Sequence, residues 1–518
     1  MDESVRADVS GVIPPQESDH SILLVAKGGS IVFGAALFGY GSQLLIGIVL
    51  TRLLGAEQYG EYKVAVIAGE MAAGFALLGL NCAMIRFISL FASRRDSAGV
   101  WGTIQVGIGL TLFTSLLIGG GLFALASPIA QYLFHEPQLA PLLRLAGLIV
   151  PFSSITAILA ESTMGFGKMQ FQAGSRSIAQ PVTRLALLLL FSLFGLTAAK
   201  ALTAYTAGLV VSSLLLLYFL DRLFTLRRPV RTGRRETGRL LRFSLPAYLS
   251  TMISTFGPSL QTILLGSLNT MATVGIFAVA NQVSTASTLF NASIGTASSP
   301  IVSRLHGQGD TKQMRHFYQT TAKWMFMANL PMFLLVLFLS TPILTIFGKE
   351  FVAGSAALTL LALANLVIAA AGVSDGVLAM TGNTPLKLVN SAAQAALSIG
   401  LCFLFIPRWG ALGAAMAVLV CSIVIHLLLV SEMFVLFRML PYSFGFLKPA
   451  AAGVVALLVG WLVQHFLHTE TSLGLAALQA LVLLVAYADM ILILGLSQED
   501  RAVIAQTRAR LTATFSRR

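Results

Sequence analysis

The sequence predicts an all-α integral membrane protein with about fourteen transmembrane helices. Of its 518 residues, 56% are hydrophobic and only 11% are charged, whereas a soluble domain typically carries about 25% charged residues. The apolar residues also come in blocks of about 20 or more, which is the length of helix that crosses a hydrocarbon core of about 30 Å. A helix suits that environment because it satisfies its own backbone hydrogen bonds.

The apolar blocks predict the spans in chain order. Six are expected before a basic loop, at 28–50, 62–90, 100–127, 140–163, 177–197 and 200–221. Six more follow that loop, at 244–266, 272–298, 324–347, 353–379, 388–406 and 410–436. A final pair is expected near 449–467 and 472–496.

The polar segments lie at the two ends and in the middle of the chain. Residues 1–27 begin with acidic residues and contain Pro14-Pro15, which predicts a disordered cytoplasmic tail. No cleavable signal peptide pattern is present in this stretch, so we expect the first apolar block to act as the insertion signal. Residues 222–243 are expected to form a basic cytoplasmic linker, and residues 498–518 a basic cytoplasmic tail.

The distribution of Lys and Arg predicts the orientation of the spans. If the N-terminus is cytoplasmic, the inner segments carry 26 of the 34 Lys and Arg residues, the outer loops carry five, and three lie within spans. Positively charged residues concentrate in cytoplasmic loops. The count therefore predicts that both termini are cytoplasmic and that the number of spans is even, in a multi-pass protein of the cytoplasmic membrane.

The chain resembles itself at an offset of roughly 211–216 residues. Residues 51–55 (TRLLG) end the first span and residues 262–266 (TILLG) end the seventh, while 164–168 (MGFGK) and 380–384 (MTGNT) follow the fourth and tenth. Gly195 and Gly410 open similar outer turns. The repeat predicts two parallel six-helix halves, 28–221 and 244–437, followed by two extra helices within 448–497.

Composition and motifs exclude several classes of function. The net charge of +13 comes from basic residues in short loops, where it indicates the orientation of the spans. We therefore expect no nucleic acid partner. The three cysteines fall inside apolar blocks, so disulfides and metal sites are not expected. No phosphate-binding glycine loop is found, and no cofactor is expected. Transport would be driven by an ion gradient, by the membrane potential or by consumption of product outside.

Several motifs together resemble one transporter family. These are residues 50–62 (LTRLLGAEQYGEY), 79–88 (GLNCAMIRFI), 275–280 (GIFAVA), 300–303 (PIVS) with 309–310 (GD), and 405–415 (FIPRWGALGAA). As a set they resemble the Wzx-like polysaccharide flippases, a branch of the multidrug/oligosaccharidyl-lipid/polysaccharide exporter (MATE/MOP) superfamily. The resemblance covers roughly residues 25–440, and a fourteen-span form occurs in this group.

The resemblance implies a fold and a function. It implies a MATE/MOP-like transporter that flips a polyprenyl-phosphate-linked glycan from the cytoplasmic to the outer leaflet by alternating access. Membrane lipids, a polysaccharide polymerase and glycosyltransferases are the partners that it suggests. One position departs from the family pattern, because many relatives carry an acidic residue where this chain has Gln261. That departure puts cation coupling at this position in doubt.

Three Arg residues within spans are the first candidates for substrate binding. A phosphate-bearing head group needs cations along its path, and the planar guanidinium can hold phosphate oxygens in a bidentate manner. Arg86, Arg144 and Arg184 could serve, and Gln43 and Asn81 could line the same cavity between spans 1, 2, 7 and 8. The structural alternative is that the Arg residues snorkel or pair with a neighbour, and that the amides join helices by hydrogen bonds.

Two acidic residues are candidates for ion coupling. Glu70 lies about one-third into the second span, where it could pair with an Arg, carry a proton or bind sodium. Asp375 lies near the inner end of the tenth span and next to Gly376. For Glu432, Asp489 and the lone His426, structural pairing or hydrogen bonding is the better interpretation.

Two other functions remain open. A cation-coupled multidrug exporter of the related MATE branch is the main alternative, although that branch usually has twelve spans. A membrane enzyme such as a sugar polymerase is less favoured, because the longest outer loop, near 128–139, is short and offers only His135 and Glu136. We expect no catalytic residues and no enzymatic activity.

Overall fold

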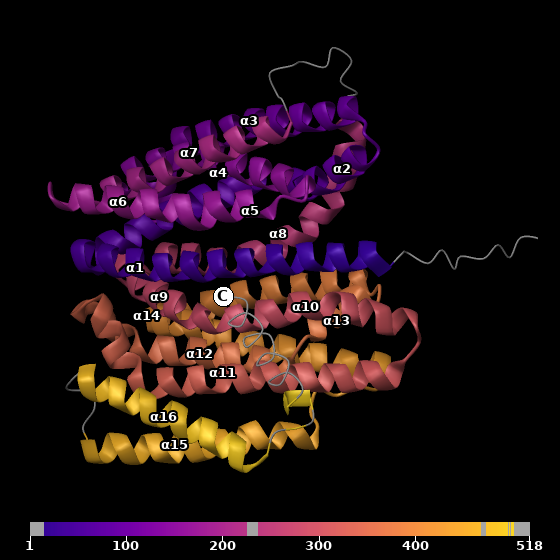
Figure 1. The fold of residues 1–518 in the computed structure, drawn as a ribbon. Helices are drawn as coiled ribbons and strands as arrows, with labels where there is room; N and C mark the ends of the chain where they lie inside the picture. The colour runs from indigo at the N-terminus through magenta and orange to yellow at the C-terminus, as the bar shows by residue number, and fades with distance from the viewer. Residues whose placement is uncertain (1–14, 225–236, 468–472, 496, 498, 502–518) are drawn as a thin grey trace, which may run out of the picture. The chain divides into compact units, whose positions relative to one another are not determined.

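A computed structural model describes residues 15–224, 237–467, 473–495, 497 and 499–501 of the chain. Within these ranges every regular element is a helix (Figure 1). Nine of the described helices are long and apolar enough to cross a membrane. The predicted class, an all-α multi-pass membrane protein, is confirmed, whereas the number of fourteen spans stays a prediction.

The helices before the central basic segment run in the expected order. They are α1 (Pro15–Ala76), α2 (Leu80–Ser93), α3 (Ser97–Pro128), α4 (Ala140–Gly165), α5 (Met169–Gln172), α6 (Gln180–Ser192) and α7 (Ala198–Leu223). A π-helix, η3 (Ala173–Ala179), joins α5 to α6. Two short turns, η1 (Ile129–Leu133) and η2 (Pro137–Leu139), join α3 to α4.

The remaining helices follow the same alternation of long spans and short turns. They are α8 (Thr237–Leu268), α9 (Met271–Ser284), α10 (Thr288–Gly307), α11 (Thr311–Phe347), α12 (Ser355–Ala371), α13 (Ser374–Met380), α14 (Thr384–Phe437), α15 (Leu447–Leu467) and α16 (Leu473–Ile493). The 3-10 turns η4 (Thr285–Ser287), η5 (Lys349–Gly354) and η6 (Phe444–Phe446) lie between them.

Glycines break the longest helices where the sequence predicts turns. Gly55 has φ of 73° inside α1, and Gly410 has φ of 51° inside α14. A residue with a side chain rarely adopts this left-handed region. Each long helix is therefore two helical segments joined at a glycine, as the separate spans predicted on either side of these positions require. The predicted span 62–90 is in addition interrupted after Ala76, because Leu78 and Gly79 also have positive φ.

The prediction of a disordered tail over residues 1–27 is wrong for its second half. Helix α1 begins at Pro15, and only residues 1–14 lie outside the described residues. Proline suits the first helical position, because its missing N–H has no partner there in any helix. Most of the predicted linker and of the C-terminal tail lies outside the described residues.

Helix boundaries recur at a constant spacing, as the internal repeat requires. Helix α4 begins at Ala140, and α12 begins at Ser355, 215 residues later. The left-handed glycines Gly167 and Gly382 are also 215 residues apart, and so are Gly195 and Gly410. The two halves therefore turn at equivalent positions and on equivalent residue types.

The described residues cluster into two compact units. Unit 1 contains those within 1–46, 69–126 and 143–249, and unit 2 contains those within 47–68, 127–142 and 250–518. These units cut across the predicted halves, because the segment 47–68 around Gly55 packs on the helices of unit 2. The assignment of residues 28–221 and 244–437 to two domains stays a prediction.

Each unit has its own apolar core. In unit 1, buried side chains of α2, α3, α4 and α7 pack together, including Met84, Ile104, Leu159 and Leu216. In unit 2, one core joins α10–α14. A smaller core, which includes Leu334 and Tyr487, joins α11 to α15 and α16, and these last two helices lie along α11 (Figure 1).

Candidate functional site

The three candidate Arg residues lie in different surroundings, although all belong to unit 1. Arg86 on α2 and Arg144 on α4 have exposed side chains. Arg184 on α6 is only 8% exposed. Burial of a guanidinium is unfavourable unless other groups compensate the charge. The groups around Arg184 therefore form the candidate binding site.

Arg184 rests on an aromatic ring in the interior of unit 1. Its guanidinium carbon lies 5.1 Å from the ring centroid of Tyr205 on α7. A cation over an aromatic face is stabilised by the ring quadrupole, by about 2 kcal/mol or more when the pair is desolvated.

The same tyrosine links Arg184 to a carboxylate. The Tyr205 hydroxyl donates to Glu70 Oε1 at 2.7 Å, and the Ser153 hydroxyl donates to Glu70 Oε2 at 2.8 Å. We call Arg184, Tyr205, Glu70 and Ser153 the α6–α7 polar cluster; its four residues come from α6, α7, α1 and α4. Glu70 thus accepts a hydrogen bond at each of its two oxygens.

Local sequence explains why Arg184 points inward. The seven-residue π-helix η3 leads directly into α6, and Pro181 lies in the first turn of α6. Pro181, Arg184 and Leu188 are all buried, and their spacing of three and four residues puts them on one helix face. A π-helix commonly marks a functional position, because its irregular turn re-aims the side chains that follow.

The other predicted site residues do not join this cluster. The Gln43 side chain on α1 is exposed, and Asn81 near the start of α2 is half-buried. Asp375, in the first turn of α13, forms an ion pair with Lys387 at 2.7 Å, and both side chains are substantially exposed. Exposed pairs of this kind contribute little to stability, so Asp375 lies in a surface pair.

Glu432 and His426 have polar partners of the kind that the sequence led us to expect. Asn390 donates to Glu432 Oε2 at 2.7 Å, and His426 Nδ1 lies 2.8 Å from the Ser422 carbonyl. The Gln261 amide donates to the Ser398 hydroxyl at 2.8 Å. Where many relatives carry a carboxylate, this chain therefore has an amide–hydroxyl contact that carries no charge.

The segment 47–68 is held tightly against α9 within unit 2. A Cβ atom on Gly60 would collide with the Met271 carbonyl, and one on Gly275 would collide with the Ala56 carbonyl. The two helices approach this closely only because both positions are glycine. Nearby, the Tyr59 hydroxyl donates to Gln282 Oε1 at 3.2 Å.

Two charged side chains fix the same segment at the Gly55 break. The backbone N–H of Ala56 donates to Glu350 Oε2 at 2.8 Å, so the carboxylate caps a new helix start. Arg52 donates to the carbonyls of Thr345 and Ile346 at the end of α11, both at 2.8 Å. Capping of orphan carbonyls by a cation is favourable at a helix C-terminus. We call this arrangement the Gly55 clasp.

Sequence reasoning missed Tyr205, Ser153 and Glu350. Ser153 and Tyr205 are uncharged residues of apolar blocks, and Glu350 lies in a short connection between two predicted spans. Tyr205 lies 21 residues after Arg184 in the chain, and nothing in that spacing indicates contact. The only available signal was the unexplained presence of Glu70 and Arg184 in apolar blocks, which predicted that each needs a partner without naming it.

Comparison with protein families gives two matches. The family model described as polysaccharide biosynthesis protein matches residues 25–306. The model of the MatE family matches residues 246–404. Among curated proteins, no sequence matches the chain.

Comparison with solved structures gives the fold. The lipid II flippase MurJ in an inward closed conformation has a TM-score of 0.72 and 15% identity, over 90% of this chain and 98% of that chain. An inward-facing multidrug resistance MATE family transporter of the MOP superfamily has a TM-score of 0.60 and 17% identity, over 77% of this chain and 95% of that chain. A MOP superfamily transporter from Pyrococcus furiosus has a TM-score of 0.51 and 17% identity, over 80% of this chain and 97% of that chain. The fold is that of MOP superfamily transporters.

Proposed function

We propose, from the premise that this chain belongs to the polysaccharide biosynthesis protein family, that it is a flippase for a lipid-linked oligosaccharide. The substrate is a polyprenyl-phosphate-linked glycan, moved from the cytoplasmic to the outer leaflet of the cytoplasmic membrane. The observation that carries this proposal is the family match, which spans residues 25–306. The likeness in fold to a lipid II flippase over 90% of the chain supports it.

The α6–α7 polar cluster supports a role in handling the phosphate. A translocated head group must exchange water for protein donors, and a guanidinium that is held on a ring can offer two parallel N–H groups to phosphate oxygens. Glu70 and Ser153 orient Tyr205, and Tyr205 orients Arg184. Arg184 is thus the residue that we assign to the phosphate, and the other three are its positioning residues.

The Gly55 clasp supports a mechanism of alternating access. The segment 47–68 closes on α9 through two glycines and on η5 through Glu350. We propose that these contacts form and break together in the transport cycle. On the orientation predicted from the loop charges, this clasp lies on the outer side and is closed here.

Transport of a labelled lipid tests the proposal directly. The full chain is reconstituted in liposomes with a fluorescent polyprenyl-pyrophosphate-linked oligosaccharide, and a membrane-impermeant quencher reports the exposed fraction under a proton gradient, a sodium gradient or an electrical potential. We expect protein-dependent movement of the labelled lipid under at least one of these three driving forces. Arg184→Gln should slow it by roughly tenfold or more, since a hydrogen bond to a charged group contributes about 1.5–3 kcal/mol.

The matched control is Arg94→Gln, which makes the same change at an exposed position after α2. It should transport at the wild-type rate. If the wild-type chain moves the probe no faster than protein-free liposomes under all three gradients, the flippase proposal fails. Equal rates for Arg184→Gln and wild type would remove Arg184 from the mechanism.

A multidrug exporter is the second candidate, favoured by the MatE match over residues 246–404. The same liposomes can be loaded with a lipophilic cation such as ethidium. Cation-driven ethidium movement without lipid movement would favour this candidate. The amide at Gln261 argues against it where coupling needs a carboxylate, because an amide does not take up a proton at physiological pH.

A further inference from the structure

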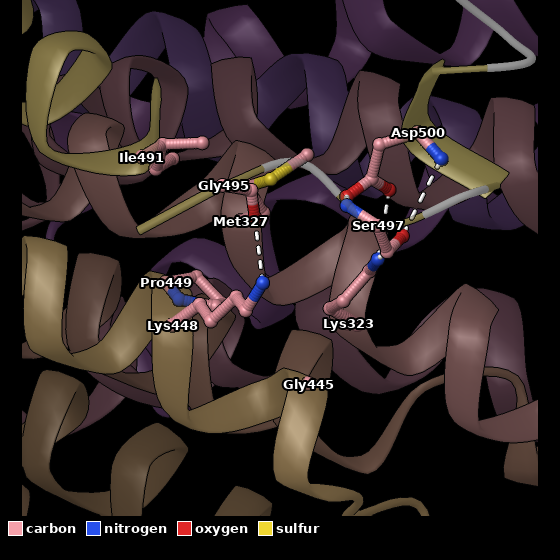
Figure 2. Close-up of a pocket in the computed structure, with 9 residues that line it drawn as sticks. All are labelled: Lys323, Met327, Gly445, Lys448, Pro449, Ile491, Gly495, Ser497 and Asp500. Atoms are coloured by element: carbon pink, nitrogen blue, oxygen red, sulfur yellow. Dashed lines mark hydrogen bonds and ion pairs between the residues drawn. The ribbon is translucent and has the colours of Figure 1, made fainter. Parts of the chain in front are cut away.

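A cavity of about 100 Å³ lies within unit 2, where α11, α15 and the segment after α16 meet. Its polar wall contains Lys323, Lys448, Ser497 and Asp500, and its apolar wall includes Met327 and Ile491. Figure 2 shows the Lys448 side chain reaching Gly495 and the Lys323 side chain reaching Ser497 and Asp500. Nothing in the proposed transport step uses this cavity.

The depth of the cavity follows from the length of the last two helices. Helices α15 and α16 each have 21 residues, which corresponds to roughly 31 Å and so to the thickness of the hydrocarbon core. Lys448 is the second residue of α15, and Gly495 lies two residues after the end of α16. Both therefore lie at one boundary of the hydrocarbon core, at the depth where lipid phosphates begin.

One of the two lysines is already neutralised. Lys323 Nζ lies 2.7 Å from Asp500 Oδ1 and 2.8 Å from Ser497 Oγ, and both charged side chains are largely buried. Trp324 Nε1 donates to the same carboxylate oxygen at 2.8 Å, and the Ser497 backbone N–H donates to Asp500 Oδ2 at 3.1 Å. The charge of Asp500 is thus matched by that of Lys323, and no contact between Asp500 and Lys448 is found within the described residues.

The second lysine keeps its charge. Lys448 Nζ donates to the Gly495 carbonyl at 2.6 Å, and no ion pair of Lys448 is found within the described residues. A carbonyl accepts one of the three ammonium protons but leaves the positive charge uncompensated. The Ser497 hydroxyl already accepts from Lys323. The cavity thus offers a surplus positive charge on Lys448.

The outer face beside this cavity is suited to lipid. Phe444 in η6 is 92% exposed and Leu447 is 62% exposed. The face continues along α15 through Val454 and Trp461, which are also exposed. Apolar side chains next to a cation at the hydrocarbon boundary match a molecule with an acyl chain and an anionic head group.

We propose that this cavity binds a phosphate group, of the kind that an anionic phospholipid presents at this depth. Lys448 holds the phosphate, and the acyl chain lies along the exposed face of α15. The Lys323–Asp500 pair forms the neutral part of the same wall. A soluble phosphate has the same head-group chemistry, and the experiment distinguishes the two.

Binding is measured on the purified full chain by native mass spectrometry. Phosphatidylglycerol, phosphatidylcholine and inorganic phosphate are added separately. We expect wild-type protein to retain phosphatidylglycerol over phosphatidylcholine, and Lys448→Gln to bind it roughly fivefold more weakly, as expected for the loss of one cation near a membrane surface. Lys448→Arg should restore binding and so separates loss of charge from misfolding.

The matched control is Lys200→Gln. Lys200 Nζ also caps backbone carbonyls, those of Phe194 and Gly195, at 2.9 and 2.6 Å, but it does not line the cavity. This variant should bind phosphatidylglycerol like wild type. Binding of inorganic phosphate that depends on Lys448, without selective lipid binding, would keep the site and assign it to a soluble ligand.

Two results would overturn the proposal. One is that Lys448→Gln binds both phosphatidylglycerol and inorganic phosphate as wild type does. The other is that Lys200→Gln loses as much lipid as Lys448→Gln, which would indicate attraction by net charge alone. Neither measurement involves transport, so each proposal can fail without the other.

Discussion

Two buried cations, one in each unit, are compensated in different ways. Arg184 in unit 1 lies over the Tyr205 ring, whose hydroxyl donates to the Glu70 carboxylate. Lys323 in unit 2 contacts the Asp500 carboxylate directly at 2.7 Å. In the first arrangement the cation lies on an aromatic ring, whereas in the second an ion pair neutralises it. A buried charge by itself therefore does not identify a binding residue; the geometry of its compensation does.

The largest expected effect comes from breaking the direct pair. Asp500→Ala should destabilise unit 2 by about 3–5 kcal/mol, because it leaves the buried Lys323 without a counter-charge. The measurement is the thermal unfolding midpoint of the purified chain in phosphatidylcholine. The double variant Lys323→Met with Asp500→Ala should recover much of the loss. An unchanged midpoint for Asp500→Ala would mean that the two cations are not compensated differently.

A smaller effect is expected in unit 1, where two substitutions at Tyr205 separate ring from hydroxyl. Tyr205→Phe keeps the ring under Arg184 and loses the bond to Glu70, which should lower stability by about 1.5–3 kcal/mol and leave most lipid transport intact. Tyr205→Leu loses both the ring and the hydrogen bond to Glu70, and this variant should transport lipid as poorly as Arg184→Gln. If Tyr205→Phe and Tyr205→Leu impair transport equally, the ring does not position the guanidinium.

The smallest effect is the response of the direct pair to pH. Burial raises the pKa of Asp500, but hydrogen bonds from Lys323, Trp324 and Ser497 outweigh burial and lower the pKa to about 2. Since the folded-state pKa lies below the ordinary value of 3.8, the stabilisation is present above that value and is lost as pH falls toward 2. The difference in unfolding midpoint between wild type and Asp500→Asn should be constant from about pH 8 to 5 and shrink below about pH 4. A decrease of this difference in midpoint already at pH 6 would contradict the lowered pKa of Asp500.

The fold could be predicted from the sequence to the extent that local rules determine it. Apolar blocks of spanning length predict helices, and glycines such as Gly55 and Gly410 predict the breaks, because positive φ favours that one residue type. The repeat could be recognised for the same reason, since Gly167 and Gly382 recur at equivalent turns. The start of α1 at Pro15 could not be predicted from the sequence, because acidic residues suit both a disordered tail and a helix N-terminus.

The candidate site could be predicted only in part, because its partners are distant in the chain. Burial of a cation requires compensation, so Arg184 and Glu70 were recognisable as unusual residues. Their connection through Tyr205 depends on how α1, α6 and α7 pack, and no spacing in one sequence encodes that packing. Arg86 and Arg144 have the same residue type in similar blocks, yet their side chains are exposed.

The contact between Lys323 and Asp500 also has a consequence for biosynthesis. The two residues are 177 positions apart, so at about 5–20 residues per second the ribosome needs roughly 9–35 s to deliver the carboxylate after the lysine. During that interval α11 is in place with an uncompensated ammonium group, and α15 and α16 have still to be inserted. The nascent chain therefore carries this ammonium group without its counter-charge until Asp500 has been synthesised. A chain shortened ahead of Asp500 would remain in that state permanently.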